Sequence, residues 1–118
     1  MALVRQTQDS RIATRHAFEA NIRIAVHRNG TRYVVQGWTR DLSESGLAAF
    51  VAHDLGVGEL VELEVPISKS ETMLFSGRVA RCRGTEYGFE FTAVSSSQRQ
   101  RIRSRLRGCP AIPSHDAR

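Results

Sequence analysis

The stretch that decides the fold is Phe-Glu-Ala-Asn-Ile-Arg-Ile-Ala-Val-His-Arg-Asn-Gly, residues 18–30. Apolar side chains occupy every second position from Phe18 to Val26, and this period of two is typical of a half-buried β-strand. The strand ends at Asn29-Gly30, a strong hairpin signal because both residues tolerate a positive φ. We therefore expect a return strand over residues 31–40, antiparallel to the first.

The remaining sequence repeats this short-strand pattern. We expect four more strands, with Pro66 ending the second of them, over residues 47–52, 60–65, 72–83 and 86–92. Six short strands with turn signals between them are typical of a barrel or a compact sandwich. Ser95-x-x-Gln98 has the spacing of a capping box, so a C-terminal helix is expected to follow it and to stop at Gly108.

Length and charge limit what this fold can be. The 118 residues suffice for one domain, which we expect to be a flexible arm (1–15), a barrel with its closing helix (16–108) and a disordered tail (109–118). The formal charge is +5, and sixteen of the seventeen basic residues are arginine. The excess of arginine indicates either an anionic partner or the codon usage of a GC-rich genome.

Several classes of protein are disfavoured by what the sequence lacks. It has no apolar run of the ~20 residues that a membrane helix needs, and no secretory signal at its start, so we expect a cytoplasmic protein without membrane insertion. The histidines lack metal-ligand spacing, and neither a phosphate-binding loop nor a nucleophile motif is present. We expect no enzyme activity, no metal and no cofactor.

Two short segments carry the candidate chemistry. Arg11 and Arg15 lie in the arm, and an arginine fork can bind phosphate or the O6/N7 edge of guanine. The predicted hairpin returns the chain to the arm at Asp41, whose two oxygens match the N1–H and N2–H₂ donors of guanine. Ser43 adds a hydroxyl, and Gly46 permits a positive φ and the close approach of a ring. This set suits an anionic guanine nucleotide and does not suit hydrolysis.

Arg11-x-x-x-Arg15 followed by Asp41-x-Ser43-x-x-Gly46 resembles the two-part signature of the PilZ domain, a bacterial receptor module for cyclic di-GMP. The resemblance covers residues 11–107 and implies an all-β fold, a six-stranded antiparallel split β-barrel with a C-terminal α-helix and no catalysis. It also implies that the five signature residues bind cyclic di-GMP. Many members have a further arginine before the pair, where this chain has Ser10, so the ligand stoichiometry stays open.

Other interpretations of the same residues stay open. The arginine pair can be a solvated arm, and Asp41 and Ser43 can be a turn that closes its own hydrogen bonds. A barrel of this kind can also serve as a protein-interaction adaptor that ignores nucleotide. Less favoured is a small nucleic-acid-binding barrel that uses the arginines of the helix. In the favoured interpretation, ligand binding orders the arm and signals to a protein partner that the sequence does not name.

Overall fold

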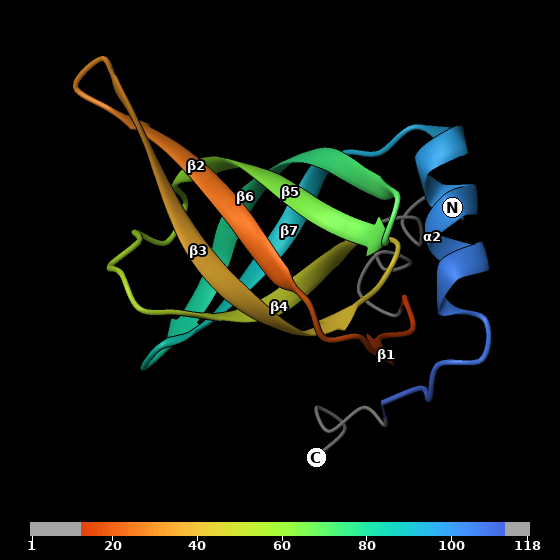
Figure 1. Ribbon diagram of the computed structural model, residues 1–118. Helices are drawn as coiled ribbons and strands as arrows, with labels where there is room; N and C mark the ends of the chain where they lie inside the picture. Colours follow the sequence, from red (N-terminus) through yellow and green to blue (C-terminus); the bar gives the residue numbers. More distant parts are fainter. Residues whose placement is uncertain (1–12, 113–118) are drawn as a thin grey trace, which may run out of the picture.

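The computed structural model describes residues 13–112 (Figure 1). Its elements in chain order are β1 (His16–Ala17), β2 (Asn21–Arg28), β3 (Thr31–Leu42), β4 (Gly46–Val51), β5 (Leu60–Ser68), β6 (Glu71–Arg83), β7 (Glu86–Ala93) and α2 (Ser96–Leu106). All strand pairs are antiparallel, in the order β1-β3-β2-β5-β6-β7-β4, and β3 also pairs with β4. That last pairing closes β2–β7 into a barrel. The predicted six-stranded antiparallel barrel with a C-terminal helix is confirmed.

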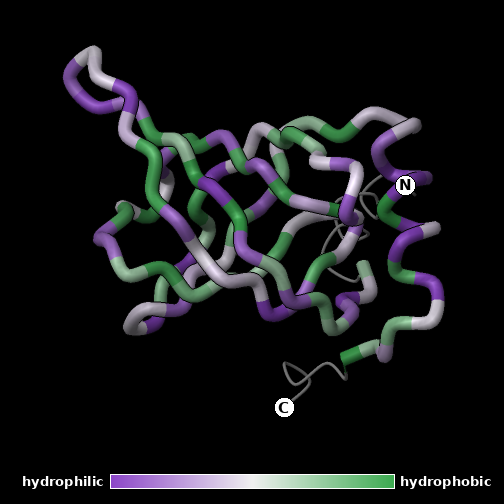
Figure 2. The backbone as a smooth tube through the Cα atoms, in the orientation of Figure 1, coloured by the Kyte–Doolittle hydropathy of each residue, from purple (hydrophilic) through white to green (hydrophobic). Residues whose placement is uncertain are grey.

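The interior of the barrel follows from the alternating pattern. Ile22, Ile24 and Val26 of β2 are at most 1% exposed, whereas Asn21, Arg23 and His27 face solvent. The same alternation along the other strands appears as changing colours in Figure 2. In the core, the rings of Phe75 and Phe91 stack with their centroids 4.2 Å apart. Removal of this apolar surface from water is the main driving force for folding.

The predicted hairpin and capping box are both present. Asn29 and Gly30 have φ values of 52° and 77°, as the turn between β2 and β3 requires. Ser95 accepts a hydrogen bond from the backbone N–H of Gln98, whose side chain bonds back to Ser95. The helix covers one end of the barrel, opposite the end where the β2–β3 hairpin projects (Figure 1), and buries Ile102 and Leu106 in the core.

Pro66 does not end its strand, contrary to the prediction. The strand β5 continues to Ser68, with Pro66 opposite Thr72 of β6. Because β2 pairs only with Val61–Glu64 of β5, the other side of β5 is unpaired at Pro66. A proline is tolerated there because its missing N–H interrupts no ladder.

Both ends of the domain also differ from the prediction. The regular ladder is interrupted between Phe18 and Ala20, where the buried hydroxyl of Thr39 accepts from the Ala20 N–H and donates to the Phe18 carbonyl, so β1 and β2 are separate strands. The predicted tail begins too early, because the backbone of Pro110 accepts a hydrogen bond from Ala17 and Ile112 donates one to Arg15. Residues 109–112 therefore belong to the folded domain, and the rest of the predicted tail lies outside the described residues.

Candidate functional site

A pocket of about 530 Å³ lies on the outer face of the barrel, where β3, β4, β7 and β6 run side by side. Its lining is mostly charged and comprises Arg15, Arg40, Asp41, Ala48, Arg81, Arg83, Glu86, Gly88 and Ile112. Four arginines against two carboxylates give this surface a net charge of +2. We call it the arginine pocket.

The floor of the arginine pocket is one row of residues across four strands. Asp41 of β3 is opposite Ala48 of β4, Ala48 is opposite Gly88 of β7, and Gly88 is opposite Arg81 of β6. A carboxylate and a guanidinium therefore stand at the two ends of the row. The two middle residues have almost no side chain: the side chain of Arg81 lies over Gly88, and Ala48 leaves room for a flat group on the sheet.

Two bulges turn Asp41 and Arg81 to the outside of the barrel. Thr39 pairs with Ala49 and Asp41 with Ala48, so Arg40 is an extra residue in β3. Strict alternation would have placed Asp41 inside the barrel with Thr39. Likewise the register shifts between Val79 and Arg81 of β6. A bulge changes the face on which the following side chains lie, and bulges often occur beside functional sites for this reason.

Asp41 is a buried carboxylate with an unused acceptor. Its residue is only 1% exposed, and its Oδ2 lies 3.7 Å from Nε of Arg15. Its Oδ1 is buried and has no hydrogen-bond partner among residues 13–112. Burial raises the pKa of Asp41 above its ordinary value, and the positive charges of Arg15 and Arg40 oppose that rise. A buried acceptor without a partner is costly, so a ligand that donates hydrogen bonds here relieves that cost.

The state of Asp41 leads to a stability prediction. Because its folded-state pKa is raised, its contribution to stability is present below the unfolded pKa of ~3.9 and is lost as pH rises through the folded pKa. Asp41→Asn removes the charge, so at neutral pH we expect its free energy of unfolding to exceed that of the unmutated chain by up to about 1 kcal/mol. Thermal unfolding from about pH 4 to about pH 8 measures this difference.

The control for this experiment is the exposed carboxylate Asp54, whose replacement by asparagine should leave the profile unchanged. An Asp41→Asn variant that is less stable than the unmutated protein at neutral pH would contradict the expected cost of burying this charge.

Arg15 is held at the edge of the pocket by its backbone. Its carbonyl accepts the N–H of Ile112, and the next two residues, His16 and Ala17, pair with Leu42 and Asp41 of β3. The side chain remains 43% exposed, so the guanidinium can reach both Asp41 and a ligand. Arg11, the other predicted arm residue, lies outside the described residues.

Ser43 and Gly46 shape the loop after β3 and do not line the arginine pocket. The hydroxyl of Ser43 accepts from the backbone N–H groups of Ser45 and Gly46, and the Ser43 N–H donates to the carbonyl of Gly46. Ser43 thus closes its own turn, the alternative that the sequence left open. The expected positive φ of Gly46 is not found. Instead, a Cβ at Gly46 would overlap the backbone carbonyl of Phe89 on β7.

Two basic residues of the pocket, Arg81 and Arg83, were not predicted from the sequence. Neither makes a hydrogen bond or an ion pair with any residue between 13 and 112. Arg40, by contrast, donates to Glu86 at 2.6 Å and lies over the ring of Phe50 at 5.8 Å. In the sequence, Arg81 and Arg83 are recognisable as an arginine pair near the end of a predicted strand. Their position on the outer face depends on the bulge in β6.

Most arginines of α2 are engaged within the domain. Arg103 holds both carboxylate oxygens of Glu44, Arg99 lies 3.7 Å from the same group, and Arg101 pairs with Glu71. Arg105 donates to the carbonyl of Ile67 and lies over the ring of Phe18. The guanidinium groups of these four arginines therefore have partners within the domain. The contacts of Glu44 also tie the loop of Ser43 to the helix.

Two negative findings apply to the described part of the chain. Between residues 13 and 112, no three His, Cys, Asp or Glu side chains gather closely enough to hold a metal ion. Over the same residues, the structure contains no helix with the length and apolar character needed to cross a bilayer.

Comparisons with known proteins identify a family whose sequence pattern this chain matches. A model described as the PilZ domain matches residues 5–108, whereas no curated protein matches the chain significantly. The PilZ domain of CeSA from a cellulose-synthesizing bacterium has a TM-score of 0.61 and 21% identity, covering 80% of this chain and 95% of its own. The PilZ domain of YcgR from Escherichia coli, solved with c-di-GMP, has a TM-score of 0.63 and 15% identity, with coverages of 80% and 86%.

Proposed function

We propose that this chain, which belongs to the PilZ domain family, is a cytoplasmic cyclic di-GMP receptor that binds its ligand in the arginine pocket. Arg15 and Asp41 contact the nucleotide there, and Arg11 joins them from the arm. Ser43 and Gly46 contribute by building the loop that follows Asp41. The related PilZ domain of YcgR, which was solved with c-di-GMP, supports the choice of ligand.

The observation that carries this proposal is the buried Asp41 carboxylate among four arginines. Its unpaired Oδ1 and its Oδ2 form an acceptor pair for the N1–H and N2–H₂ groups of guanine. Adenine has no such donor pair, so Asp41 selects guanine. A cyclic dinucleotide has two phosphodiester charges, which the net charge of +2 in the pocket can balance.

In the proposed mechanism, the ligand recruits the arm. Arg15 is already held beside the pocket by its backbone and by β1, so binding brings Arg11 to the phosphates next to it and thereby changes the surface seen by a protein partner. The loop after Asp41 takes part, since Glu44 connects it to Arg103 of α2 through two hydrogen bonds. The helix and the arm are therefore the elements through which the signal reaches the partner.

Calorimetric titration of the chain with cyclic di-GMP tests the proposal. We expect saturable binding, a stoichiometry that resolves the question raised by Ser10, and no comparable heat with GTP. Affinity should fall as pH falls through the raised pKa of Asp41, because a protonated carboxyl cannot accept from both guanine donors. The Asp41→Asn variant should bind weakly and without this pH dependence. Absence of saturable heat at high micromolar ligand would reject the receptor function.

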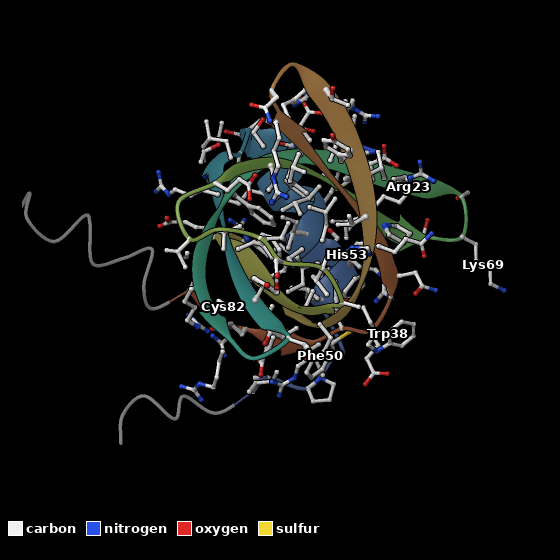
Figure 3. The ribbon with its side chains drawn as sticks, turned by 90° about the vertical axis from the view of Figure 1, so that its left-hand side faces the viewer. Arg23, Trp38, Phe50, His53, Lys69 and Cys82 are labelled. Atoms are coloured by element: carbon white, nitrogen blue, oxygen red, sulfur yellow. The ribbon has the colours of Figure 1, made fainter. Side chains whose placement is uncertain are left out.

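One surface favours a second function, that of a protein-interaction adaptor. Trp38 and Phe50 are opposite each other in β3 and β4, 43% and 42% exposed, and their side chains stand together on the outside of the barrel in Figure 3. Exposed aromatic residues of this kind are enriched in protein interfaces. If the chain is only an adaptor, protease sensitivity near Arg11 should not respond to cyclic di-GMP.

A further inference from the structure

We propose that Arg81 is a specificity-determining residue of the arginine pocket, which reads the O6/N7 edge of guanine while Asp41 reads the N1/N2 edge. This inference rests on the proposed function. It assigns a role to a side chain of β6 that belongs to neither half of the two-part signature.

The position of Arg81 relative to Asp41 is set by the sheet. The two residues stand at opposite ends of the row that runs through Ala48 and Gly88. Adjacent strands are about 4.8 Å apart, so the two backbones are separated by about 14 Å. The Arg81 side chain lies back across β7, which reduces the gap to about two strand spacings. A base lying on Ala48 fits between the two groups.

Gly88 holds the Arg81 side chain in that position. A Cβ at Gly88 would stand 3.0 Å from Cγ of Arg81 and 3.2 Å from both its Cζ and its Nε. The side chain therefore lies against the backbone of β7, in space that any other residue at 88 would occupy. A guanidinium ordered in this way before binding loses less freedom when it meets a ligand.

Arg81 is also chemically available. It makes no hydrogen bond or ion pair with residues 13–112, although its charge acts on Asp41, whereas Arg40 pairs with Glu86 and Arg78 with Glu90. A free fork of donors matches the two acceptors O6 and N7 of guanine in a bidentate way. With N1–H and N2–H₂ bound to Asp41, this acceptor edge remains open to the rest of the row.

The test compares cyclic di-GMP with its 7-deaza-guanine analogue, which lacks only the N7 acceptors. We expect the unmutated chain to bind the analogue about 10-fold more weakly, as the loss of half of a bidentate contact implies. Arg81→Ala should weaken binding of cyclic di-GMP about 10- to 100-fold and bind the two nucleotides equally. Arg81→Lys keeps the charge without the fork, so it should also lose discrimination between them.

Arg78→Ala is the matched control, because Arg78 is also exposed on β6 but pairs with Glu90 outside the pocket. It should keep both the affinity and the discrimination. An Arg81→Ala variant that still prefers cyclic di-GMP over the analogue would overturn the inference and leave the receptor function standing. An unmutated chain that binds neither nucleotide would overturn the proposed function itself.

Discussion

Arg15→Ala is expected to weaken binding of cyclic di-GMP by about 100-fold, the loss of charge-assisted hydrogen bonds to phosphate. Arg15 also supports Asp41, since the ion pair at 3.7 Å opposes the effect of burial on the pKa of that carboxyl. Without Arg15 the pKa of Asp41 should rise further, so the acceptor that guanine needs is ionised less often. The substitution removes a ligand contact and weakens a second one.

The fold should tolerate this change. The Arg15 side chain is 43% exposed, and the strand pairing of β1 uses backbone atoms only. We expect a loss of at most about 1 kcal/mol of stability. Arg23→Ala is the control, because Arg23 is an exposed arginine that pairs with Glu64 away from the pocket. Calorimetric titration with cyclic di-GMP compares the affinities of the two variants. An Arg15→Ala variant that binds as tightly as Arg23→Ala would contradict a role for Arg15 in binding the ligand.

Gly46→Ala is expected to have the largest effect on stability, a loss of about 3 kcal/mol or more. The added Cβ would overlap the carbonyl oxygen of Phe89, a backbone atom that cannot move without separating β4 from β7. A neighbouring hydrogen bond, from the Phe91 N–H to the carbonyl of Ser45, holds β7 against the start of β4. Loss of this contact should open the barrel beside the loop that follows Asp41.

Gly56→Ala is the matched control for Gly46→Ala. A Cβ at Gly56 has only a flexible carboxylate oxygen of Glu59 nearby, at 3.9 Å, and Gly56 does not have a positive φ. Chemical denaturation should show little change or a small gain for this variant. If Gly46→Ala were within about 1 kcal/mol of the unmutated chain, the strand contact would not be the reason for glycine at this position.

Structural features that depend on only a few neighbouring residues were predicted correctly from the sequence. The alternation from Phe18 to Val26, the Asn29-Gly30 turn and the capping box at Ser95 each contain their cause within a few residues. From these, the barrel, its closing helix and the approach of Asp41 to the arm could be expected. The proximity of Arg15 and Asp41 followed directly from the hairpin.

The features that were missed depend on contacts between distant segments. Pro66 lies within a strand because β2 leaves that part of β5 unpaired. The reason for glycine at position 46 is a carbonyl on β7, more than forty residues away along the chain. Arg81 and Arg83 reach the pocket only because β6 contains a bulge, and a bulge is a change of register that no local pattern of side chains revealed.

Nuclear magnetic resonance titration of the isotope-labelled chain with cyclic di-GMP is the most direct test of binding in the arginine pocket. We predict saturable shifts of backbone amides around the arginine pocket, at residues 15–17, 41–47 and 81–88. Amides at the Asn29-Gly30 turn and beside Lys69, far from that face, should not move. No shifts at saturating nucleotide, or shifts confined to the exposed aromatic pair Trp38 and Phe50, would contradict binding in the arginine pocket.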